Sequence, residues 1–239
     1  MGIRRGEITT KIVSDGLVFN MDPGNRASTI PSTSTSTTFN TIDTSVSGSF
    51  INDTFYDSST IFPSFDFDGT DDYIQTNFLQ DVTNNFSVFS WINVDSPSNT
   101  KYYFLGTREE STSASTSKGF TFWLDSSREI QARIYTTTSN ITQVTAGVVT
   151  NGVWANVAFT YVASSKTLKI FRNGIEVGST TGTAAGVTSP DNLGIGRTAT
   201  GGQYGYFDGN IGPVQIYNRA LSAEEVLSNY NGLRGRFGL

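Results

Sequence analysis

Short apolar runs separated by turn residues follow one another along the chain, and no periodic helix interrupts them. The run FSVFSWINV, residues 86–94, is the most informative, because Phe89 and Trp91 occupy one of its alternating faces while Val88 and Ile92 occupy the other. A strand with two apolar faces is buried on both sides. Many short strands divided by turns are typical of an antiparallel sandwich or barrel. We therefore predict an all-β fold, and 239 residues suffice for one such domain.

The second half of the chain carries one hairpin signal and one helix signal. Asn173-Gly174, between two alternating runs, is the sequence of a two-residue type I′ turn. Further on, Ser222 and Glu225 have the spacing of a capping box, and Gly232 is expected to end the helix that they begin. The sequence thus predicts one short C-terminal helix beside the strands.

The domain boundaries follow from these patterns. Residues 1–14 are weakly patterned and are expected to form an N-terminal arm. Residues 15–232 hold the sandwich, with Gly16–Asp22 as its first core strand, and residues 233–239 form a C-terminal tail. The Ser/Thr-rich segment 27–60 is expected to be a long surface loop of this domain, because the part before it is too short to fold alone.

Two residue types are missing from the chain, and their absence excludes several kinds of catalysis. Cysteine is absent, so disulfides, thiolate metal sites and thiol nucleophiles are excluded. Histidine is absent as well, which excludes serine triads, HExxH zinc sites and histidine general bases. We expect that the protein is not an enzyme.

Charge and hydropathy narrow the set of partners. The net charge of −5 does not attract nucleic acid or an anionic membrane, so we expect neither as a partner. No run of 18 apolar residues is present, and no transmembrane helix is expected. Arg4 and Arg5 are not followed by an apolar stretch, and we expect no signal peptide.

Four phrases of the sequence together resemble the concanavalin A-like superfamily, in its laminin-G and pentraxin branch. They are FDFDGTDDYIQT, NNFSVFSWINV, GVWANVAFTYVASSKTLKIFRNGIEV and FDGNIGPVQIYNRALSAEEVLSNYN. The resemblance implies an antiparallel two-sheet jelly-roll sandwich with a short helix after the final strand. Glucanases of this superfamily carry an E-x-D-x-E strand motif, and this chain lacks it. That departure agrees with a protein that does not catalyse.

The ends of the chain resemble modules of tailed bacteriophages from marine and cyanobacterial hosts. The matching positions are Met1, Gly2, Arg5, Gly6, Gly16 to Val18, Asp22, Asn25 and Arg236 to Leu239. The resemblance implies a structural protein of the virion, either a capsid decoration protein or a component of a fibre or tail. Its partners would be other virion proteins and further copies of the chain in a homo-oligomer. The residues expected to dock are Arg4, Arg5, Arg234, Arg236 and Phe237.

An acidic turn is the candidate metal site. Asp66, Asp68, Asp71 and Asp72 lie within seven residues and could supply oxygen ligands to Ca²⁺. Aspartate is also frequent in tight turns, because its carboxylate accepts hydrogen bonds from the local backbone. The loop GRTATGGQYGYFDG stands where pentraxins place an acidic calcium loop, and it lacks the acidic ligands. We expect no cofactor and no bound metal, with Asp68, Asp71 and Asp72 as the alternative Ca²⁺ ligands.

Two loops contain the candidate ligand-binding residues, and the family topology would bring them together at the rim of the sandwich. The residues are Arg108, Glu109 and Glu110 in the first loop, and Arg197, Gln203, Tyr204 and Tyr206 in the second. Planar aromatics beside arginine, amide and carboxylate groups suit sugar recognition. A glycan-binding adhesin that recognises a host-surface polysaccharide is therefore the alternative function. The same tyrosines would equally suit a protein interface or the sandwich edge.

Overall fold

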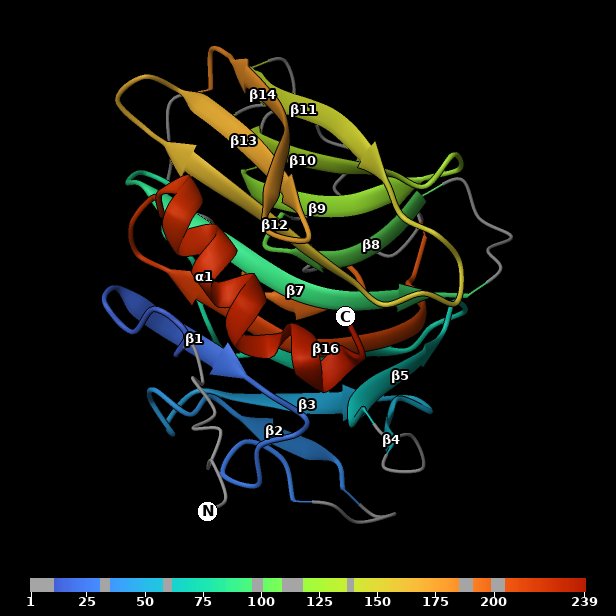
Figure 1. Ribbon diagram of the computed structural model, residues 1–239. Helices are drawn as coiled ribbons and strands as arrows, with labels where there is room; N and C mark the ends of the chain where they lie inside the picture. The colour runs from blue at the N-terminus through green and yellow to red at the C-terminus, as the bar shows by residue number, and fades with distance from the viewer. Residues whose placement is uncertain are drawn as a thin grey trace, which may run out of the picture.

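The computed structural model describes residues 11–30, 35–57, 62–95, 101–108, 118–136, 140–184, 191–198 and 205–239. Two antiparallel sheets pack face to face, and a C-terminal helix lies across the outside of one of them (Figure 1). This arrangement confirms the predicted two-sheet sandwich with one short helix.

The sheet beneath the helix, here called sheet A, has the strand order β14-β13-β12-β7-β16-β5-β4, and β1 also pairs with β16. Its strands are β1 (Leu17–Met21), β4 (Phe55–Asp57), β5 (Ser64–Asp68), β7 (Phe86–Val94), β12 (Ala155–Val162), β13 (Thr167–Arg172), β14 (Ile175–Thr181) and β16 (Asp208–Tyr217). Asn173 and Gly174 both have positive φ, at 51° and 79°, which confirms the type I′ turn between β13 and β14.

The opposite sheet, sheet B, has the order β11-β10-β9-β8-β15-β6-β3-β2. Its strands are β2 (Thr37–Phe39), β3 (Ser47–Ile51), β6 (Tyr73–Thr76), β8 (Lys101–Gly106), β9 (Gly119–Asp125), β10 (Glu129–Tyr135), β11 (Ile141–Val148) and β15 (Gly194–Ile195). Phenylalanines fill the space between the sheets. The Phe159 ring of sheet A meets the Phe122 ring of sheet B edge-on, with centroids 5.0 Å apart, and both side chains are fully buried.

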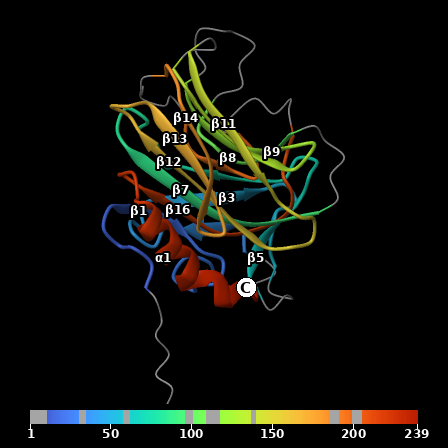
Figure 2. The same cartoon turned by 45° about the horizontal axis from the view of Figure 1, so that its top comes forward.

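Strand β7 is buried on both faces, as its sequence predicted. Val88 and Ile92 belong to the core between the sheets, whereas Phe89 packs on the outer side with Leu221 and Val226 beneath the helix. The helix, α1 (Ala223–Leu233), thus covers part of the outer face of sheet A. Figure 2 shows it lying outside β7 and β16, on the side away from β8 and β9.

Helix α1 begins as predicted and ends later than predicted. Ser222 is its N-cap, and both hydrogen bonds of the capping box with Glu225 are present. The expectation that Gly232 ends the helix is wrong, because α1 continues to Leu233 and then into a 3₁₀ turn, η1 (Arg234–Phe237). The left-handed residue that ends this turn is Gly238, with φ of 73°. No helix in the described part of the chain is long and apolar enough to cross a membrane.

The C-terminal residues pack against the chain's own sandwich. Phe237 is 3% exposed, stacks on Trp91 at 4.1 Å and contacts Trp154 at 4.8 Å between ring centroids. Arg236 forms two charged hydrogen bonds with Asp22, at 2.8 and 2.7 Å. These contacts extend the cover over sheet A from the helix to the end of the chain.

The Ser/Thr-rich segment contains strands β2, β3 and β4, so the expectation of a long surface loop over residues 27–60 is wrong. A few of its hydroxyl groups are buried and bond to one another. Thr38, fully buried on β2, contacts the hydroxyls of Ser28 at 3.2 Å and Thr29 at 2.9 Å. Polar side chains that satisfy one another can enter an interior that their composition alone would place outside.

We expect Phe237→Ala to lower the free energy of unfolding by about 3–5 kcal/mol, the usual cost of removing a buried phenylalanine ring. Urea denaturation followed by tryptophan fluorescence measures this, since Trp91 and Trp154 flank the ring. Leu239→Ala is the matched control, because Leu239 is 42% exposed. It should change stability by less than about 0.5 kcal/mol. Equal effects of the two substitutions would contradict the packing described.

Candidate functional site

The outer face of sheet B carries a cluster of arginine and aromatic side chains. On β9 and β10, one set of alternating residues fills the core, and the other set points outward and includes Thr121, Trp123, Gln131, Arg133 and Tyr135. We call this cluster the arginine–aromatic face. Its members are Tyr73, Gln75, Tyr103, Arg108, Thr121, Trp123, Gln131, Arg133, Tyr135, Gln143, Arg197 and Tyr206.

Arg133 lies in the middle of β10 and is held by two rings. Its guanidinium carbon is 5.0 Å from the ring centroid of Trp123 and 5.4 Å from that of Tyr135. Nη1 donates a hydrogen bond to the Tyr135 hydroxyl at 2.9 Å. Within the described residues Arg133 has no ion pair, and its buried Nε has no hydrogen-bond partner. Stacking fixes the plane of this cation and leaves its charge without a counter-ion.

Thr121 stands directly opposite Arg133 in the pairing of β9 with β10. Its side chain is fully buried, and its hydroxyl finds no hydrogen-bond partner in the described part of the structure. Directly paired residues of antiparallel strands have Cβ atoms about 5 Å apart. Two residues with unsatisfied polar atoms are therefore cross-strand neighbours, and each such atom costs about 1–3 kcal/mol. A pair of this kind marks a position where a ligand or a water molecule completes the hydrogen bonding.

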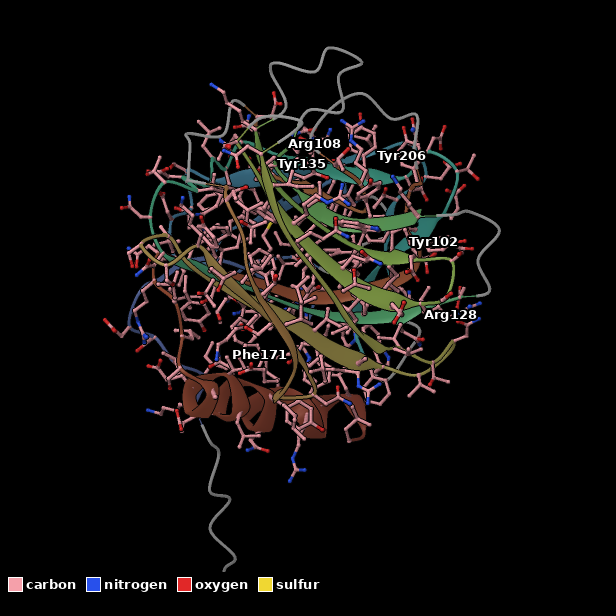
Figure 3. All side chains as sticks on the ribbon, turned by 90° about the horizontal axis from the view of Figure 1, so that it is seen from above. Tyr102, Arg108, Arg128, Tyr135, Phe171 and Tyr206 are labelled. Carbon is pink, nitrogen blue, oxygen red and sulfur yellow. The ribbon has the colours of Figure 1, made fainter. Side chains whose placement is uncertain are left out.

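Arg108 follows β8 and brings a second cation to the same ring. Its guanidinium carbon lies 4.1 Å from the centroid of Tyr135. Figure 3 shows Arg108 and Tyr135 together on the side of the molecule opposite α1, whereas Phe171 lies next to the helix. Arg108 and Arg133 thus share Tyr135, which concentrates positive charge on a protein whose net charge is −5.

Arg197 forms the second centre of the face. Its guanidinium carbon is 3.4 Å from the ring centroid of Tyr73, it donates to Gln75 Oε1 at 3.0 Å, and Tyr206 lies 6.3 Å from Tyr73 between centroids. The backbone reaches this position because β15 offers a glycine. A Cβ on Gly194 would stand 2.8 Å from the carbonyl oxygen of residue 198, so only glycine lets the segment cross the sheet here.

Amide and hydroxyl groups continue the face beyond Arg133. Gln131 Oε1 accepts from Gln143 at 2.9 Å and from Thr145 at 2.7 Å. Gln131 Nε2 donates to Asp125 at 2.7 Å. The other oxygen of Asp125 accepts two backbone N–H groups of the following turn. This carboxylate is therefore engaged locally and does not neutralise Arg133.

The structure brings together three of the predicted ligand-binding residues. Arg108, Arg197 and Tyr206 all lie on the arginine–aromatic face. The other four, Glu109, Glu110, Gln203 and Tyr204, lie outside the described residues. Sequence reasoning missed Arg133, Tyr135, Trp123, Thr121 and Tyr73. For all of these except Tyr73, a signal existed in the outward positions of GFTFWLD and EIQARIY, which carry rings and an arginine where a solvated strand face carries small polar residues.

The acidic turn between β5 and β6 uses its carboxylates on its own backbone. Asp68 Oδ1 accepts from the Thr70 N–H at 2.8 Å, and Asp72 Oδ2 accepts from the Asp68 N–H at 3.1 Å. Carboxylate oxygens of Asp68, Asp71 and Asp72 lie within 4.8 Å of one another, a spacing that a Ca²⁺ ion could bridge. The backbone hydrogen bonds account for Asp68 and Asp72 as turn residues.

Burial, with a smaller contribution from neighbouring carboxylates, raises the pKa of Asp66 on β5 and of Asp208 on β16. Burial raises the pKa of Asp66 to about 6, against the effect of the 2.7 Å hydrogen bond from Asn210, and the charges of Asp57 and Asp95 add to the rise. Burial also raises the pKa of Asp208, with further contributions from Asp95 and Asp68. This end of sheet A is therefore acidic, whereas the arginine–aromatic face is basic.

A comparison with models of protein families identifies the family of this chain. Residues 68–227 match the family model described as the concanavalin A-like lectin/glucanases superfamily, in its laminin-G type. Since the match covers more than half of the chain, the protein belongs to this family. No curated protein sequence matches the chain.

Solved structures share the fold at low sequence identity. The binding domain of botulinum neurotoxin serotype D matches with a TM-score of 0.67 and 14% identity, over 91% of this chain and 52% of that chain. A Trypanosoma rangeli sialidase in complex with sialic acid matches with a TM-score of 0.65 and 13% identity, over 92% of this chain and 33% of that chain. The chain thus spans about a third of the sialidase and about half of the toxin domain. These likenesses show the fold alone.

The raised pKa of Asp66 predicts a pH-dependent gain from Asp66→Asn. With a pKa of 3.8 when unfolded and about 6 when folded, the charged form is disfavoured in the native state above pH 6. This penalty vanishes as the pH falls towards 3.8. Asp66→Asn should therefore raise the free energy of unfolding by about 1 kcal/mol at pH 7.5, a value discounted for solvent screening of a half-buried group. At pH 3.5 we expect almost no gain.

Urea denaturation at the two pH values measures this difference. Glu176→Gln is the control, because its carboxylate only pairs with the exposed Lys169. It should change stability by less than about 0.5 kcal/mol. A loss of stability for Asp66→Asn at pH 7.5 would show that burial does not penalise the charge.

Proposed function

We propose that the protein is a non-catalytic, glycan-binding module that uses the arginine–aromatic face. The observation that carries the proposal is that Arg108, Arg133 and Arg197 each lie over an aromatic ring on one face of sheet B. Arginines held flat on rings present fixed donors, and amides beside them add further hydrogen-bonding groups. Such an array suits hydroxyl-rich, polar ligands and requires no resident cofactor.

Two further points support glycan binding. The chain belongs to a superfamily described by its lectins and glucanases. One of the proteins that share its fold is a sialidase whose structure holds sialic acid. The chain spans only a third of that sialidase, and it lacks the histidine and cysteine that many hydrolases use. Binding without catalysis is therefore the function that the residues support best, with a host-surface polysaccharide as the proposed target.

A glycan array probed with the purified protein tests this function. Arg108→Ala and Arg197→Ala should each weaken binding to the glycans that the wild type binds by about 10-fold, since each substitution removes a charged hydrogen-bond donor. Lys169→Gln is the matched control, because it removes one positive charge from an exposed position on sheet A, and it should bind like the wild type. Binding should persist in EDTA if no Ca²⁺ is required. Retained binding in both arginine variants would place the site elsewhere.

We further propose, as a second function, that the protein is a structural component of a phage virion. The phage-like ends of the sequence support this role. Within the C-terminal tail, Phe237 and Arg236 are engaged with Trp91 and Asp22 of the same chain, whereas Arg234 is exposed on η1. Docking would then depend on Arg234 and on the first residues of the chain, where Arg4 and Arg5 lie outside the described part. Neighbouring virion proteins or further copies of the chain would be the partners.

A truncation that lacks residues 1–8, combined with Arg234→Ala, tests the virion role. We expect it to fold normally and to be lost from purified particles, as judged by mass spectrometry. The C-terminal tail stays in place, because its removal would uncover Trp91. Normal incorporation of this variant would contradict the role, and Lys169→Gln serves as the control for removal of an unrelated surface charge.

A further inference from the structure

We propose that the arginine–aromatic face recognises an acidic sugar through its carboxylate, which Arg133 and Thr121 bind together. This inference rests on the proposed glycan binding and adds the chemical class of the ligand. It assigns the central contact to two residues that neighbour each other across β9 and β10.

One edge of the Arg133 guanidinium has no partner in the described structure, and the Nε of that edge is buried. Nη1 is used by the Tyr135 hydroxyl, and among the described contacts Nε and Nη2 donate to nothing. The Nε–Nη2 edge carries two parallel N–H groups, which match the two oxygens of a carboxylate. The rings of Trp123 and Tyr135 hold the guanidinium plane in place, so the donors are oriented before the ligand arrives.

Thr121 supplies the second contact. Its buried hydroxyl lacks a partner within the described residues, and its strand position directly faces Arg133. An oxyanion that pairs with the Arg133 edge would lie within reach of this hydroxyl, which can donate to it. One carboxylate would then satisfy both groups that the fold leaves unsatisfied, whereas a neutral hydroxyl offers a single acceptor oxygen and no charge.

A second arginine lies close to Arg133. Arg108 shares the Tyr135 ring with Arg133, at 4.1 Å from its centroid, and thus adds a second positive charge nearby. Asp125 on β9 is engaged by Gln131 and by the backbone of its turn. Gln143, which pairs with Arg133 on the other side, is partly buried and would meet the hydroxyls of the same sugar ring.

The test compares one sugar with and without its charge. Trigalacturonic acid and its methyl ester are titrated into the intact protein by isothermal calorimetry at low salt. The wild type should bind the acid at least about 10-fold more tightly than the ester, because only the acid forms a charged bidentate pair. Arg133→Gln should abolish this preference, because it weakens binding of the acid far more than binding of the ester. Arg133→Lys, which keeps the charge without the planar edge, should retain only part of it.

Thr121→Val guards against an effect of folding, because it removes a hydroxyl that bonds to nothing in the described structure. It should fold at least as stably as the wild type and bind the acid about 3–10-fold more weakly. Lys169→Gln, on sheet A, should leave both affinities unchanged.

Different failures are distinguishable. Equal affinity for acid and ester, or an acid preference that survives Arg133→Gln, would overturn the inference and leave glycan binding intact. Tighter binding of a sulfated oligosaccharide than of the uronate would overturn the carboxylate assignment. If the wild-type protein bound no glycan on the array, both the proposed function and the inference would be contradicted.

Discussion

The stacking of Phe237 on Trp91 completes the burial of strand β7, and the rest of the molecule is arranged around that strand. Strand β7 lies in the middle of sheet A, between β12 and β16. Its inner side chains fill the core, and its outer ones would expose large rings to water if nothing covered them. Helix α1 and η1 provide the cover, and Arg236 anchors their end to Asp22 at 2.7 Å. The C-terminal residues are therefore a structural part of the sandwich.

This cover makes the two outer faces of the sandwich different. Sheet A is closed by a helix, so its outer rings pack as a second small core. Among the described residues no helix crosses sheet B (Figure 1), and its outer rings instead lie beneath arginines. Stacking shields the apolar ring surface while each guanidinium keeps its edge towards polar partners. A face of this kind is stable in water and still carries hydrogen-bond donors. A packed apolar face carries none.

The sequence allowed the class of fold to be predicted, because the evidence for it is local. Alternation, the Asn173-Gly174 turn and the Ser222 capping box each depend on neighbouring residues, and each is confirmed. The helix end was missed because it depends on Phe237 meeting Trp91, a contact between residues far apart in the sequence. For the same reason the site was found only in part. Arg108 and Arg197 were recognisable as loop residues. Arg133 is recognisable as a site residue only once Trp123 and Thr121 are known to be its neighbours on β9.

Asp66 and the Arg133–Thr121 pair are both polar groups in unfavourable surroundings, and the two cases differ in kind. At the acidic end of sheet A, Asp66 receives a hydrogen bond from Asn210, and a proton can relieve the remaining repulsion, as its pKa of about 6 indicates. The unfavourable burial of Asp66 can therefore be relieved without a ligand. Arg133 has no such route, since its Nε meets no acceptor in the described structure. The unsatisfied edge of Arg133 and the Thr121 hydroxyl can find hydrogen-bond partners only outside the described contacts. Natural proteins keep unsatisfied groups of this sort chiefly at binding sites.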